Sequence, residues 1–174
     1  MQALKVGNPL DPEVQIGPVV SNKQLKNNLN NIDAAKNEGA EVVGGEQIKR
    51  STNGYYQAPA AFLNATNAMQ TSREEIFGPC ARVIRVSDFD EAIDVANDTE
   101  FGLSAGICTT SLKQARAFKR RAKAGMVMVN LPTAGVDYHV PFGGRKGSSL
   151  GAREQGSYAA EFYTIVKTSY TFSG

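Results

Sequence analysis

The chain has 174 residues, of which 41% are hydrophobic and 21% are charged, and its net charge is +2. These values are those of an ordinary globular chain, and the charge is too small to indicate a nucleic-acid partner or an acidic membrane surface. No apolar run is long enough to span a membrane, and no signal-like segment follows Met1. Two cysteines make neither a disulfide framework nor a zinc site, so we expect no metal and a reducing, cytoplasmic compartment.

The first half of the chain predicts a capped helix followed by two strands. Residues 1–18 contain three prolines and no periodicity, which indicates an extended lead-in. Residues 21–24 match a capping box that opens a helix, and Gly39 is its expected end. The apolar face of this helix consists of Leu25, Leu29 and Ile32. Two strands are then expected, at residues 40–43 and at residues 55–63 with an interruption at Pro59.

The second half alternates between strands and helices. Short apolar runs predict three strands, at residues 80–86, 104–109 and 126–130. Asp88 and Ser111 open the two helices between them. The residues expected to pack inward are Ala92, Ile93 and Ala96 in the first helix and Leu112, Ala115, Phe118 and Ala122 in the second. This order predicts an α/β fold with a parallel sheet, flanking helices and right-handed crossovers.

Alternation over residues 161–172 predicts a long strand near the C-terminus. One face of it would carry Phe162, Thr164, Val166, Thr168, Tyr170 and Phe172. A strand without a hairpin partner leaves its backbone groups unpaired. We therefore expect this segment to pair elsewhere in the fold or with another subunit.

The hexapeptide Glu74–Pro79 lies where a polar loop enters an apolar strand, a position at which binding residues collect. The carboxylate of Glu75 can accept hydrogen bonds from a sugar diol, while the ring of Phe77 packs on a flat heterocycle. The same residues also suit a simple turn, with Phe77 in the core and both glutamates, Glu74 and Glu75, in water. The residues alone leave both interpretations open.

The hexapeptide, E-E-I-F-G-P, resembles a signature of the aldehyde dehydrogenase superfamily. Four further stretches resemble that family in order and spacing: residues 5–12 (K-V-G-N-P-L-D-P), 16–18 (I-G-P), 97–103 (N-D-T-E-F-G-L) and 141–149 (P-F-G-G-R-K-G-S-S). Five ordered motifs that span nearly the whole chain are specific together, although each alone is not. The resemblance implies an α/β domain of the aldehyde dehydrogenase catalytic type.

The resemblance also has a gap. Family members carry a nucleophilic cysteine, a general-base glutamate and a cofactor domain before the V-G-N-P motif, which begins here at Val6. The resemblance therefore implies that residues 1–160 are the C-terminal part of a catalytic domain and that residues 161–174 are an oligomerisation strand. It also implies that this chain alone is inactive. The parent reaction would oxidise an aldehyde to an acid through a thiohemiacetal and a thioester, with NAD or NADP as cofactor.

The resemblance assigns cofactor roles to three residues. Glu75 would hold the hydroxyls of the nicotinamide ribose, and Phe77 would flank the nicotinamide ring. Gln24 stands where a family glutamine approaches the ribose, but its place in the capping box favours a structural role, and Asn27 replaces a common basic neighbour.

Two residues are expected to line the aldehyde pocket, Phe142 and Val136, and for both a core position is the alternative. Residues 131–149 resemble those of the bacterial α-ketoglutaric semialdehyde dehydrogenases. That resemblance implies a small anionic aldehyde as substrate. A cationic side chain or backbone N–H donors would be needed to bind its carboxylate. Arg145 and Lys146 are near Phe142 in sequence, and surface exposure is expected for both.

Two other functions remain open at this point. One is a non-catalytic subunit that docks through residues 161–172 on a full-length homologue. The other is an unrelated thiol enzyme that uses Cys108 and His139. We expect both Cys80 and Cys108 to be small buried hydrophobic residues and His139 to be structural.

Overall fold

The computed structural model describes residue 1, residues 3–135 and residues 137–174. The chain divides into two compact units, Met1–Val86 and Ser87–Gly174, and each unit has its own core. Among the described residues, no helix is long and apolar enough to cross a membrane. The predicted division into residues 1–160 and an assembly tail stays a prediction.

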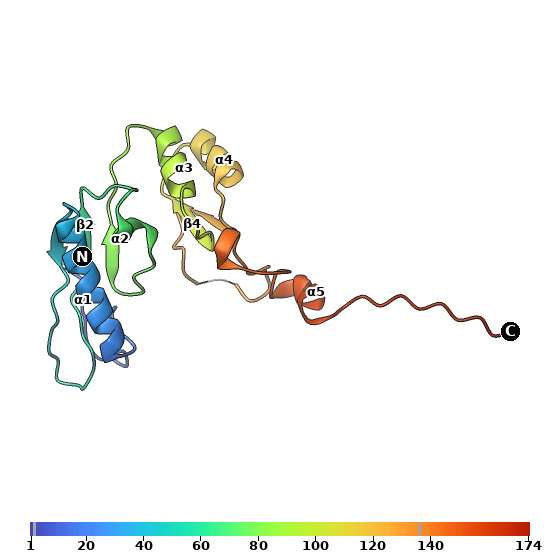
Figure 1. Cartoon of the computed structure of the whole chain (residues 1–174), viewed down its shortest axis with the longest axis horizontal. Coiled ribbons are helices and arrows are strands. Elements are labelled where there is room, and N and C mark those ends of the chain that lie inside the picture. Colours follow the sequence, from blue (N-terminus) through green and yellow to red (C-terminus); the bar gives the residue numbers. More distant parts are fainter. Residues whose placement is uncertain (2, 136) are drawn as a thin grey trace. The chain divides into compact units, whose positions relative to one another are not determined.

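In the N-terminal unit, helix α1 packs on a three-stranded sheet (Figure 1). The sheet order is β1 (Glu41–Gly44), β2 (Ala60–Leu63) and β3 (Cys80–Arg82), with β2 antiparallel to β1 and parallel to β3. Strand β1 has the predicted length and is shifted by one residue, whereas β2 and β3 are shorter than the runs that predicted them. The core consists of Ile32, Ala35, Ala40, Ala60, Phe62 and Ile76.

Helix α1 (Asn22–Asn37) begins where the capping box predicted, because the Ser21 side chain accepts a hydrogen bond from the Gln24 backbone N–H. Leu25 and Ile32 are buried on its inner face, and Leu29 is partly buried against the same core. The Gln24 side chain contacts other residues than Ser21, so only half of the predicted capping box forms.

The short helix α2 (Gln70–Arg73) leads into the hexapeptide and is fixed at both ends. At its start, the Glu38 carboxylate accepts hydrogen bonds from the backbone of Gln70 (2.6 Å) and from the Thr71 hydroxyl (2.7 Å). At its end, Arg82 of β3 donates to the carbonyl groups of Thr71 and Glu74. The segment before the hexapeptide is therefore held by a side chain at the C-cap of α1 and by one from β3.

In the C-terminal unit, two helices pack on a parallel pair of strands (Figure 1). The elements are α3 (Phe89–Asn97), β4 (Ser104–Ile107), α4 (Leu112–Arg121) and β5 (Met126–Val129). The parallel pairing of β4 with β5 across α4 confirms the predicted α/β character. Strand β3 pairs with β2 instead.

Two predicted core residues of these helices are exposed. Ala96 is exposed in the last turn of α3, one residue before the helix ends at Asn97. Leu112 is 81% exposed, since it lies at the first position of α4, one turn before the first buried residue, Ala115.

Hydrogen bonds join two of the family-like stretches, residues 97–103 and residues 141–149. The backbone N–H groups of Arg145 and Gly147 donate to the carbonyl groups of Gly102 and Glu100, and Gly102 donates to the Ser148 hydroxyl. A Cβ on Gly125 would lie 2.0 Å from the Gly143 carbonyl oxygen, so the backbones meet without room for a side chain. The remaining elements are two 3-10 turns, η1 (Lys146–Ser148) and η2 (Gly156–Tyr158).

The predicted C-terminal strand is wrong at its start. Residues Ala159–Tyr163 form helix α5, for which Ala, Ala and Glu have high helix propensity. Beyond it, residues 164–174 are exposed and pair with no other strand in the described parts of the chain. A strand needs a neighbouring strand for its hydrogen bonds, and a single chain does not supply one here.

We predict that Glu38→Gln destabilises the N-terminal unit at neutral pH and much less in acid. The Thr71 hydroxyl and the α2 backbone N–H groups lower the pKa of the Glu38 carboxyl. A carboxyl whose pKa is lowered by folding stabilises the protein above its unfolded pKa, and that contribution is lost as the pH falls through the folded pKa.

Chemical unfolding of the wild type and of the Glu38→Gln variant, at neutral and at acidic pH, measures this difference in the free energy of unfolding. Glu41→Gln, an exposed residue of β1, is the control. If the free energies of unfolding of the wild type and of Glu38→Gln differed equally at both pH values, the stabilising role of the ionised Glu38 carboxylate would be contradicted.

Candidate functional site

Three residues predicted to serve the cofactor line one hollow of the N-terminal unit. Gln24 reaches it from α1, and Glu75 and Phe77 reach it from the hexapeptide. The hollow has a volume of about 380 Å³, and its other lining residues are Asn27, Asn30, Asn31, Glu74 and Ile76. Residues about 50 positions apart in sequence thus meet where α1 faces the loop.

Phe77 projects its ring out of the core. The side chain is 72% exposed, whereas its neighbour Ile76 is 6% exposed and belongs to the core cluster. Phe77 also has a φ of +55°, a left-handed backbone that is unusual for a bulky residue. Such a conformation costs about 1–3 kcal/mol and collects at functional sites. The alternative in which Phe77 plugs the core is therefore wrong, and Ile76 takes that place.

The two glutamates of the hexapeptide differ in their partners. Glu74 accepts a hydrogen bond of 2.7 Å from the side-chain amide of Gln70. Glu75 is exposed, and its carboxylate has no hydrogen-bond or ion-pair partner among the described residues. The acceptor oxygens of Glu75 are therefore not used within the described structure.

Gln24 has a structural contact in this hollow. Its side-chain nitrogen donates to the carbonyl oxygen of Ile76 at 2.8 Å and to the Asn28 side chain at 2.7 Å. This bond joins α1 to the hexapeptide directly. The structural role favoured by the capping pattern is thus present, although its partner is the loop rather than Ser21.

The exposed groups of the hollow fit the ribose and the ring of a nicotinamide nucleoside. A carboxylate with unused oxygens accepts hydrogen bonds from adjacent hydroxyls, and charge-assisted bonds are the stronger kind. An aromatic face two residues away offers apolar contact to a flat ring. These acceptor oxygens and this apolar ring are chemically suited to that end of a dinucleotide.

The predicted substrate residues belong to the C-terminal unit or lie outside the described residues. Phe142 is half-buried and exchanges two backbone hydrogen bonds with Glu154, of 2.7 and 3.0 Å. Val136 lies outside the described residues. Arg145 and Lys146 are exposed, as expected, and the Lys146 ammonium donates to the carbonyl groups of Asn97 and Thr99.

The two cysteines and the histidine form no catalytic arrangement in the described part of the chain. Cys80 is partly buried, and burial raises the pKa of its thiol. Cys108 is exposed, which corrects the expectation that it is buried. His139 is exposed beside Asp137 (3.4 Å) and Tyr138, and no hydrogen bond joins it to Cys108.

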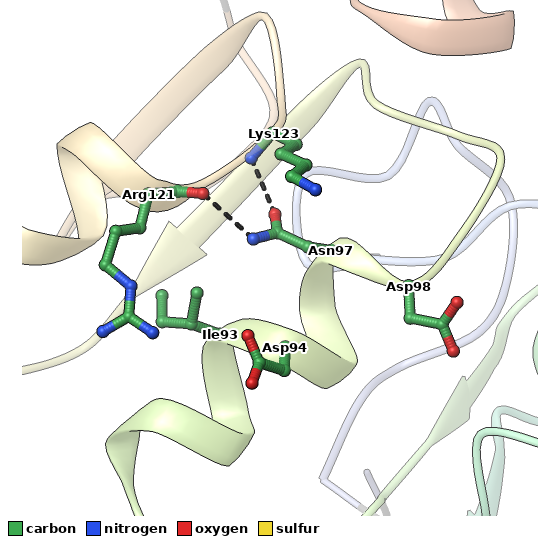
Figure 2. A pocket seen from close by; sticks show the side chains of 6 residues that line it. All are labelled: Ile93, Asp94, Asn97, Asp98, Arg121 and Lys123. Carbon is green, nitrogen blue, oxygen red and sulfur yellow. Dashed lines mark hydrogen bonds between the residues drawn. The ribbon is translucent and has the colours of Figure 1, made fainter.

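A second hollow, of about 450 Å³, lies between the C-terminal ends of α3 and α4. Figure 2 shows Asn97 at its centre, donating to the Arg121 carbonyl (2.9 Å) and accepting from the Lys123 backbone (2.7 Å). The other lining residues are Ile93, Asp94 and Asp98. Sequence reasoning missed this role of Asn97, the first residue of the N-D-T-E-F-G-L stretch, because it depends on a contact more than 20 residues away.

Comparisons with known proteins place these features in a family. The α-ketoglutaric semialdehyde dehydrogenase of Bacillus subtilis is 42% identical over 170 residues, which are 96% of this chain and 35% of that protein. A betaine aldehyde dehydrogenase of Cereibacter sphaeroides is 42% identical over 172 residues, 99% of this chain and 35% of that protein. The chain thus spans about a third of the length of the curated relatives it matches.

Solved structures agree with the sequence comparison. An indole-3-acetaldehyde dehydrogenase of P. syringae, solved as a mutant with NAD+ and IAA, superposes with a TM-score of 0.86 at 39% identity. The match covers 95% of this chain and 33% of that one. Residues 1–169 match the aldehyde dehydrogenase family. The chain therefore belongs to the aldehyde dehydrogenase family.

Proposed function

We propose that residues 1–174 form the part of an NAD(P)-dependent aldehyde dehydrogenase that holds the nicotinamide-ribose end of the cofactor. One observation carries this proposal: Gln24, Glu75 and Phe77 line a single hollow, with the Glu75 carboxylate and the Phe77 ring exposed in it. Family membership and the relative solved with NAD+ support it.

In this proposal each residue has a defined task. The Glu75 carboxylate accepts hydrogen bonds from the ribose hydroxyls and so fixes the position of the sugar. Phe77 presents its ring to the nicotinamide and keeps water from that face. The nicotinamide ring supplies the hydride acceptor when it is bound. The nucleophile and the general base come from residues other than those of this chain.

We propose a small anionic semialdehyde, of the α-ketoglutaric semialdehyde type, as the substrate. The name of the B. subtilis relative supports this choice, and Phe142 remains the proposed pocket wall together with Val136. Two of the three donors of the Lys146 ammonium already bond to carbonyl oxygens. Arg145 is therefore the better candidate of the two for the substrate carboxylate.

We further propose that the chain assembles into homo-oligomers through its tail. Val166, Tyr170 and Phe172, which would share one face of a strand, are each more than 90% exposed in the single chain. Such a row of apolar side chains on unpaired backbone favours the addition of a strand from another subunit. The same feature would serve the alternative function, a non-catalytic subunit that docks on a full-length homologue.

The first prediction concerns Glu75 in the whole protein that carries this chain. Glu75→Ala should lower kcat/KM for NAD+ roughly ten- to a hundredfold, the equivalent of about 1.5–3 kcal/mol for hydrogen bonds to a charged group. The free energy of unfolding should change by no more than ~0.5 kcal/mol, because the side chain is exposed.

Glu74→Ala is the matched control, since its carboxylate bonds to Gln70. It should cost about twofold at most, in line with surface substitutions. Wild-type kinetics in Glu75→Ala together with a large loss of stability would refute the cofactor role.

The second prediction is that the 174-residue chain alone oxidises no aldehyde. Neither cysteine is paired with a base in the described residues. The measurement is NAD(P)H formation with a panel of anionic and cationic aldehydes. Robust turnover that disappears in Cys80→Ser or Cys108→Ser would overturn this expectation.

The third prediction concerns assembly. The intact chain should sediment as a dimer or larger, whereas a chain that ends at Gly156 should be monomeric or aggregated, because the exposed tail is the proposed contact. A well-folded monomer of the intact chain at high micromolar concentration would show that the tail does not drive assembly.

A further inference from the structure

A relay of side-chain amides runs beneath the hexapeptide. It begins at Gln24, whose nitrogen donates to Asn28 Oδ1 (2.7 Å). Asn28 Nδ2 then donates to Gln57 Oε1 (2.9 Å), and Gln57 Nε2 points to the sulfur of Cys80 at 3.7 Å. Asn28 and Gln57 are 0% and 1% exposed, so two polar amides are fully buried between α1 and the segment that leads into β2.

Buried amides of this kind need a physical reason, because an apolar side chain of similar size would fill the same space without the desolvation cost. The side-chain amide of Asn28 lies 2.7 Å from that of Gln24 and 2.9 Å from that of Gln57, so hydrogen bonds join the three side chains. A buried network of hydrogen bonds restricts the groups it joins to few arrangements. Two members of this network, Gln24 and Asn28, contact the residues on either side of Phe77, which are Ile76 and Gly78.

The relay holds the residue before Phe77 and the residue after it. On one side, Gln24 fixes the carbonyl group of Ile76 at 2.8 Å. On the other, Gly78 packs so closely on Asn28 that a Cβ at Gly78 would lie 2.2 Å from Asn28 Nδ2. Phe77, with its φ of +55°, therefore stands between two positions that the amides define. A left-handed backbone at a bulky residue persists only where its surroundings fix it in this way.

We propose that Asn28 and Gln57 are positioning residues for the loop that carries Glu75 and Phe77. They contact no ligand themselves, and they act through Gln24 and Gly78 to set the direction of the Phe77 ring and the place of the Glu75 carboxylate. The consequence for cofactor binding rests on the function proposed above, whereas the ordering of the loop does not.

The test measures, by ¹⁹F NMR and in the absence of cofactor, whether the loop that carries Phe77 is ordered. The 174-residue chain is labelled with 4-fluorophenylalanine at its eight phenylalanines, and the ¹⁹F signals of Phe77 and Phe62 are assigned. Asn28→Leu removes the amide at similar volume. It should shift or split the Phe77 signal toward that of the unfolded chain and leave the signal of Phe62, buried in the same unit, unchanged. Asn37→Leu, at the exposed end of α1, is the control and should change neither.

The other outcomes decide against the proposal. An unchanged Phe77 signal would show that the amides do not position the loop. An equal change at Phe62 and Phe77 would show that Asn28 only supports the core. If Asn28→Leu does not fold, Gly78→Ala replaces it, because the added Cβ pushes the loop off Asn28. The same selective change at Phe77 is then expected, and its absence overturns the proposal.

Kinetics separate this inference from the proposed function. In the whole protein, Asn28→Leu should raise the KM for NAD+ about tenfold, the equivalent of losing one hydrogen bond to the cofactor, and leave the KM for the aldehyde unchanged. A disordered loop with an unchanged KM for NAD+ would refute the cofactor role of the hollow and leave the positioning role intact.

Discussion

The loop that carries Glu75 and Phe77 depends on the burial of the side chain between them, Ile76. Ile76 belongs to the core formed by α1 and the sheet, and its carbonyl group is bonded to Gln24. Because Ile76 points inward, its two neighbours point outward, and the left-handed φ of Phe77 turns the chain before Gly78 meets Asn28. The local strain at Phe77 is sustained by apolar burial on one side and by buried amides on the other.

The C-terminal unit follows a similar plan with different groups. There, the N-D-T-E-F-G-L stretch closes the end of α3, and Asn97 joins it to the end of α4. The stretch at residues 141–149 then binds back onto it through Arg145, Gly147 and Ser148. In the described structure these two stretches serve as connectors between helix ends and loops.

Features encoded by neighbouring residues could be predicted from the sequence, and features that depend on distant contacts could not. Ser21 and Ser111 cap their helices as the pattern indicated, because capping involves residues only three positions apart. The sequence left open whether Phe77 enters the core or faces a ligand, because its exposure depends on the contacts that its neighbours Ile76 and Gly78 make with α1, about 50 positions away in sequence. The alternation over residues 161–172 predicted a strand, but residues 161–163 belong to helix α5 and the rest has no neighbouring strand to pair with in the described structure.

The central claim is that the hollow of Gln24, Glu75 and Phe77 receives the nicotinamide riboside portion of the cofactor, and NMR can test it directly. The ¹⁵N-labelled chain would be titrated with NAD+ and with nicotinamide riboside. The account predicts that both ligands shift the amide signals of residues 24–27 and 75–78, and that Glu75→Gln abolishes these shifts. Shifts confined to the second hollow, at residues 93–98 and 121–123, or an absence of shifts at millimolar ligand, would contradict it.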